Sequence, residues 1–99
     1  MIARFFLAAL LLAASIPSAD AATQTPPPGA LLCSGCHATK RTVETPVPRL
    51  VGRSPTDIEA AIVAFRTGQR TATVMDRIAK GFSDDEVKAI AEWYGVQKD

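Results

Sequence analysis

The stretch that decides the fold is Cys33-Ser34-Gly35-Cys36-His37, which places two thiols three residues apart and an imidazole directly after the second. Residues three apart share one face of a helical turn, so both thiols can react with one flat molecule. This C-x-x-C-H spacing is the attachment signal of c-type haem, in which the thiols bond to the porphyrin and the histidine binds its iron. The sequence therefore predicts one covalent haem c per chain.

Other interpretations of Cys33 and Cys36 fit the sequence less well. A thioredoxin-like redox pair belongs beside a βαβ pattern, and no alternating strand runs are present. A structural zinc site requires four ligands, whereas the chain has two cysteines and one histidine. A disulfide between the two closes a loop too short to stabilise the fold much. We favour haem attachment and keep the redox dithiol and the simple disulfide as alternatives.

The sixth position of the iron is assigned mainly by composition. His37 is the only histidine, which excludes bis-histidine ligation, and Met75 is the only methionine besides Met1. Met75 follows a predicted helix end at Gly68, in a loop from which a thioether can reach iron. We therefore predict His37 and Met75 as the axial ligands of the metal. The alternatives are a methionine that fills a gap in the core and an open or lysine-ligated sixth site.

The beginning of the chain differs in composition from the rest. Residues 1–21 hold sixteen apolar residues, with one early cation, an apolar run over residues 5–14 and small residues at the end. This is the pattern of a secretory signal, and the run is shorter than the roughly 20 apolar residues of a membrane span. We expect cleavage before Ala22, which leaves residues 22–99 as one exported, periplasmic domain without a membrane span.

The charge and length of the exported domain argue against some functions and favour a bound cofactor. Its 78 residues include ten basic and nine acidic side chains. Proteins that bind nucleic acids present a strongly basic face, so this near-neutral balance argues against nucleic acid as a partner. Domains of this size usually need a disulfide, a metal or a cofactor for stability. A buried porphyrin supplies the apolar centre that so short a chain lacks.

Three to four short helices are expected. Pro26-Pro27-Pro28 is extended, so a short first helix begins near Gly29 and carries the C-x-x-C-H motif. A middle helix follows Ser54, where S-x-x-D forms a capping box with proline at the first position, and it ends at Gly68. The last helix follows a second capping box at residues 83–86. The expected buried stripes are Ile58, Ala61, Ile62 and Phe65 in the middle helix and Val87, Ile90, Ala91 and Tyr94 in the last, with Trp93 packing beside them.

The order of these motifs resembles class I cytochrome c. The shared features are a C-x-x-C-H helix, a Pro-x-Leu-x-Gly segment, a middle helix, a methionine loop and a last helix that ends in aromatic residues. The resemblance covers residues 30–96 and implies a small all-α fold around one haem, so that residues 22–99 are a monohaem cytochrome c domain. More narrowly, residues 65–86 resemble the cytochrome subunit of flavocytochrome c sulfide dehydrogenase, which accepts electrons from an FAD-containing partner.

This resemblance implies further roles in residues 48–52. Pro48 matches the family proline whose carbonyl accepts a hydrogen bond from the haem histidine and so fixes the ring, and Leu50 matches a residue that packs on the haem. The sequence departs from the family at Ala38, where a glycine is common, and in its proline-rich start. Because that start shortens the first helix, we expect a weaker crossing of the first and last helices.

Three functions compete on these grounds. The first is periplasmic electron transfer by a His/Met-ligated haem, as the non-catalytic cytochrome subunit of an FAD-containing sulfide dehydrogenase. The second is a free soluble carrier that serves other redox proteins. The third is a haem-based ligand-binding protein, which requires an open sixth site. Four basic residues near the methionine form either a docking patch or a solvated face, namely Arg66, Arg70, Arg77 and Lys80.

Overall fold

Four helices and their connecting loops make up residues 25–98, the part of the chain described by this computed structural model. No strand occurs in this range, which confirms the predicted all-α fold. No helix in it is long and apolar enough to cross a membrane. The expected signal peptide lies outside the described residues. The helices are α1 (Ala30–Cys33), α2 (Pro55–Arg66), α3 (Met75–Ala79) and α4 (Asp84–Val96).

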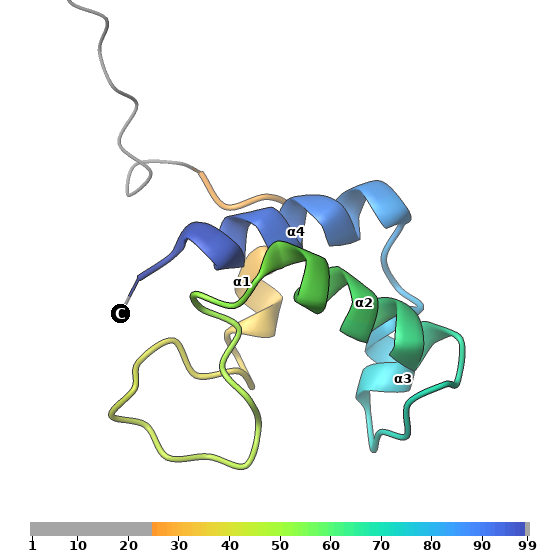
Figure 1. Ribbon diagram of the computed structural model, residues 1–99, viewed down its shortest axis with the longest axis horizontal. Coiled ribbons are helices and arrows are strands. Elements are labelled where there is room, and N and C mark those ends of the chain that lie inside the picture. The colour runs from red at the N-terminus through yellow and green to blue at the C-terminus, as the bar shows by residue number, and fades with distance from the viewer. Residues whose placement is uncertain (1–24, 99) are drawn as a thin grey trace, which may run out of the picture.

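Helix α4 supplies most of the core. It crosses α1 and packs against α2 (Figure 1), and the four residues of its predicted stripe are all buried. The predicted capping box is confirmed, because Ser83 Oγ accepts a hydrogen bond from the Glu86 N–H and the Glu86 carboxylate accepts one from the Ser83 N–H, both at 3.2 Å. These two bonds satisfy N–H groups that a helix start otherwise leaves without partners.

The crossing of α1 and α4 is tight, so the prediction of a weaker crossing was wrong. Ala30 has no exposed surface, and a Cβ atom on Gly29, which has a φ of +85°, would overlap the ring of Phe82. The buried Tyr94 hydroxyl donates a 2.5 Å hydrogen bond to the Ala30 carbonyl oxygen. Burial also raises the pKa of the Tyr94 phenol, which keeps the donating form in alkaline solution. Small residues therefore anchor α1, although it is only one turn long.

Helix α2 begins at Pro55 as predicted, but its predicted capping box does not form. Ser54 occupies the N-cap, and its side chain makes no capping hydrogen bond. Proline at the first position already removes one of the N–H groups that need a partner. Gly68, with a φ of +77°, follows the end of the helix. Of the predicted stripe only Ile58 is fully buried, and Ala61, Ile62 and Phe65 are partly buried. The second half of α2 lies beside the five-residue α3 (Figure 1).

Gly95 allows the end of α4 to lie against the start of α2. A Cβ atom at this position would stand 2.6 Å from Pro55 Cγ and 3.1 Å from the Arg53 carbonyl oxygen. Beside this contact, the Gly52 N–H donates a 3.1 Å hydrogen bond to the Tyr94 carbonyl oxygen. The segment that leads into α2 is thus attached to α4, which continues through the glycine to Val96.

Replacing Tyr94 with phenylalanine is expected to lower the free energy of unfolding of the haem-loaded protein by about 1–3 kcal/mol, because the buried Ala30 carbonyl loses this donor. Denaturant titration measures the change. Thr67→Val is the matched control, since it removes an exposed hydroxyl that donates to the Val63 carbonyl oxygen at 2.9 Å, and it should change stability by less than about 0.5 kcal/mol. Equal losses in the two variants would contradict the role of Tyr94 in the helix crossing.

Candidate functional site

The C-x-x-C-H motif is divided between α1 and the turn that follows it, whereas the sequence predicted that one helix carries all of it. Cys33 is the last residue of α1, and Cys36 and His37 lie in the turn. The turn keeps helix-like hydrogen bonds, from the Cys36 N–H at 3.2 Å and the His37 N–H at 2.9 Å to the Cys33 carbonyl oxygen. The two thiols and the imidazole therefore remain within one continuous helical turn and a half.

The two cysteines form no disulfide with each other and lie in different surroundings. Cys33 is partly buried, packs against the core between α1 and α4, and points its Sγ to the Gly29 carbonyl oxygen at 3.7 Å. Burial raises the pKa of the Cys33 thiol, while its backbone hydrogen bond acts in the opposite direction. Cys36 is exposed. The motif thus has one thiol on the core and a second at the surface.

The His37 ring is oriented by the backbone of a distant loop residue. Its Nδ1 lies 2.5 Å from the Pro48 carbonyl oxygen, so the contact that the family resemblance implied is present. A carbonyl oxygen only accepts hydrogen bonds, so Nδ1 is the donor, and in the neutral ring Nε2 then keeps its lone pair. A neutral imidazole whose other nitrogen is held in this way is the usual form of a metal-binding histidine. This orientation leaves Nε2 available as a candidate metal ligand.

The loop between α1 and α2 is closed at its base. Besides the His37 contact, Arg49 Nη2 donates to the Thr39 carbonyl oxygen at 3.1 Å. Leu50, which the resemblance places on the haem, packs against the same core cluster as Cys33. The structure therefore brings the first thiol, the imidazole and the two predicted loop residues into one region of the fold.

Met75 is the first residue of α3, so the predicted loop position was wrong. The helix begins here because the Val74 carbonyl oxygen accepts hydrogen bonds from the N–H groups of Arg77 and Ile78, at 3.0 and 3.1 Å. Met75 is partly buried. Helix α3 packs on α2, at the end of α2 away from α1 (Figure 1). The predicted sixth ligand therefore belongs to a different part of the fold from the C-x-x-C-H turn.

The residues around these positions suit a large apolar cofactor. Leu32 precedes the first thiol and is 77 % exposed, and Val74 and Ile78 flank Met75 with 52 % and 43 % exposure. Exposed apolar side chains beside each group of candidate ligands are compatible with a surface that another molecule covers. Two thiols, an imidazole with an available Nε2 and a thioether also match the donor set of a c-type haem.

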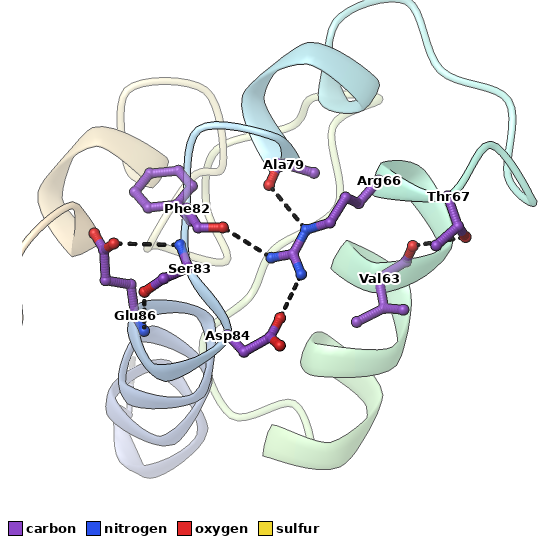
Figure 2. Close-up of polar contacts among 8 residues, drawn as sticks. All are labelled: Val63, Arg66, Thr67, Ala79, Phe82, Ser83, Asp84 and Glu86. Carbon is purple, nitrogen blue, oxygen red and sulfur yellow. Dashed lines mark hydrogen bonds and ion pairs between the residues drawn. The ribbon is translucent and has the colours of Figure 1, made fainter.

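Sequence patterns place Arg66 in one basic group with Arg70, Arg77 and Lys80. They do not reveal the contacts that Arg66 makes with other parts of the chain. The Arg66 side chain is only 25 % exposed, and its guanidinium forms an ion pair with Asp84 at 2.5 Å and donates to two carbonyl oxygens (Figure 2). The Arg70 guanidinium lies 4.8 Å from the centroid of the Phe65 ring. These contacts contradict a uniform solvated face. They join residues up to 18 positions apart, which local sequence patterns do not encode.

Two similar proteins reveal the family. The chain is 45 % identical over 65 residues to the cytochrome subunit of sulfide dehydrogenase from Chlorobaculum tepidum, a match that covers 66 % of this chain and 59 % of that protein. It is 39 % identical over 70 residues to cytochrome c-554(548) from Halomonas halodenitrificans, covering 67 % of this chain and 84 % of that protein. The chain belongs to the class I c-type cytochromes. No protein-family model matches this cytochrome.

Membership of this family confirms the predicted cofactor and general role. The cytochrome carries covalently bound haem c and transfers electrons, and it is not itself a catalyst. Attachment of this haem through Cys33 and Cys36, as the motif predicts, would exclude both a redox dithiol and a simple disulfide. The match spans only 59 % of the Chlorobaculum protein. It therefore supports membership of the family, and it does not show that this chain forms the same enzyme complex.

The thiols can be tested by mass spectrometry after coexpression with haem-attachment machinery. We expect the wild-type chain to retain the mass of one haem after acid-acetone extraction, and the double variant Cys33→Ala/Cys36→Ala to lose all of it, because both thioethers are gone. Ser34→Ala, which changes an exposed hydroxyl in the same turn, should keep the haem. Retention of haem mass by the double variant would contradict the assignment of these thiols.

Proposed function

We propose that this cytochrome passes single electrons through one haem with His37 and Met75 as the axial ligands of the iron. The observation that carries the proposal is the hydrogen bond between His37 Nδ1 and the Pro48 carbonyl oxygen, because it leaves Nε2 free to bind the metal. We further propose that the protein is the periplasmic cytochrome subunit of an FAD-containing sulfide dehydrogenase. Its similarity to the Chlorobaculum subunit supports this second step.

Each site residue has a distinct part in this proposal. Cys33 and Cys36 hold the porphyrin through two thioethers, and the Pro48 carbonyl fixes the His37 ring and raises its basicity. Leu50 packs on the cofactor from the core side. When bound, the haem supplies a one-electron couple, and the combination of histidine and methionine ligands raises its reduction potential. None of these residues makes or breaks a substrate bond.

Exchange of electrons with a partner requires only a close and brief approach. Small, transient interfaces are typical of redox proteins. Cys36 is exposed, so a ring attached there reaches the surface beside the C-x-x-C-H turn. We place the approach of the flavoprotein on this side of the molecule.

A free soluble carrier is the second candidate, and a separate observation favours it. The match to cytochrome c-554(548) covers 84 % of that protein, so the chain accounts for nearly the whole of a short cytochrome. A haem-based ligand-binding protein, the third candidate, requires an open sixth site, which Met75 closes in the proposed arrangement.

Purification of the native protein from periplasm distinguishes the first two candidates. The subunit proposal predicts that an FAD-containing protein copurifies in stoichiometric amount, and that this complex reduces the haem when sulfide is added. The same material should begin at Ala22, since residues 1–21 match a cleaved secretory signal. A cytochrome that purifies alone, and that added flavoprotein and sulfide do not reduce, would contradict the subunit proposal and support the free carrier.

A further inference from the structure

We propose that Arg66 is a positioning residue for Met75, and that its contacts decide how firmly the methionine sulfur stays on the iron. This inference rests on the proposed ligation by His37 and Met75. Arg66 is the last residue of α2, nine positions before Met75, and it acts through the helix that carries Met75 rather than on the haem.

The guanidinium of Arg66 joins three consecutive pieces of the chain (Figure 2). Nε donates to the carbonyl oxygen of Ala79, the last residue of α3, at 3.4 Å. Nη2 donates to the Phe82 carbonyl oxygen at 2.9 Å, in the turn before α4. Nη1 contacts Asp84 Oδ1, at the start of α4, at 2.5 Å. One side chain of α2 therefore connects the end of α3 to the beginning of α4.

Helix α3 depends on such outside contacts because it is very short. Five residues are too few for a helix to be stable alone, and the Val74 side chain at its N-cap makes no capping hydrogen bond. Its last carbonyl groups lack partners within the helix, and a cation is favourable at that end. Ala79 is 1 % exposed, so the arginine satisfies a carbonyl of a buried residue. Met75 lies about one turn away in the same helix and moves with it.

The three contacts of Arg66 contribute unequally to stability. Asp84 is 89 % exposed, and ion pairs at the surface contribute little to stability. The bonds to Ala79 and Phe82 are partly buried. The charged donor makes the 2.9 Å bond to Phe82 stronger than an ordinary hydrogen bond, and the longer 3.4 Å bond to Ala79 adds a weaker contact. The carbonyl contacts, more than the ion pair, therefore fix α3. Lysine at this position would keep the charge but lose the fork of donors that reaches both carbonyls.

Looser attachment of α3 should change the affinity of the haem-loaded protein for imidazole, a small ligand of haem iron. When Met75 leaves the iron, imidazole can bind in its place, and its apparent affinity rises with the fraction of molecules in the open state. Loss of the Arg66 contacts should increase that fraction. It should also leave the other iron ligand unaffected, because His37 is fixed by Pro48.

The experiment is an imidazole titration of the haem-loaded ferric protein, followed through the weak near-infrared absorption band of the methionine–iron bond. We expect Arg66→Gln and Arg66→Lys to bind imidazole about tenfold more tightly than the wild type, which corresponds to about 1.4 kcal/mol. Arg66→Lys keeps the side-chain stem and the charge, so it can be used for the same titration if Arg66→Gln does not fold.

Three controls separate positioning from other effects. Asp84→Asn removes only the exposed ion pair, and Lys88→Gln makes the same charge change as Arg66→Gln at an exposed position of α4. Tyr94→Phe weakens the α1–α4 crossing without changing a contact of α3. All three should bind imidazole within about twofold of the wild type.

Two results would overturn the inference while His/Met ligation stands. One is wild-type imidazole affinity in both Arg66 variants, with the near-infrared band present. The other is an equal increase in affinity in Tyr94→Phe, which would mean that general destabilisation is the cause. Absence of the band from the haem-loaded wild type is a different failure, because it would overturn the proposed ligation itself.

Discussion

The hydrogen bond from the Tyr94 hydroxyl to the Ala30 carbonyl oxygen holds the part of the chain on which the chemistry depends. Helix α1 has four residues and is too short to be stable alone, yet it positions two thiols and an imidazole against one cofactor. The close approach of α4 gives it a fixed place, and Gly29 and Ala30 make that approach possible. Cys33 then packs against the same core.

The same arrangement recurs on the other side of the molecule. Helix α3 carries Met75 and is also too short to be stable alone, and it is attached through Arg66 at the end of α2. In both places a long helix contributes one polar side chain that reaches the backbone of a short helix. The long helices thus provide stability, and the short helices carry the candidate ligands.

Features encoded by nearby residues were predicted well from the sequence. The capping box at Ser83 and the buried stripe of α4 depend on residues within a few positions of one another, and the C-x-x-C-H motif lies in five consecutive residues. The wrong predictions have two kinds of cause, one in the local backbone and one in contacts between distant residues. The Ser54 box matched a pattern that the backbone does not use, and the tight crossing of α1 depends on Tyr94, 64 positions from Ala30. The role of Arg66 likewise depends on partners 13 to 18 positions away.

The axial ligands were inferred from composition and from the hydrogen bond that orients His37, so a direct measurement at the iron is the sharpest test of the central claim. The near-infrared spectrum of the haem-loaded ferric protein should show the weak methionine–iron band. Met75→Ala should abolish the band and allow rapid binding of carbon monoxide after reduction, while Val74→Ala, a change at the exposed neighbour, should keep it. A wild-type protein without the band, or a Met75→Ala variant that retains it, would contradict ligation by His37 and Met75.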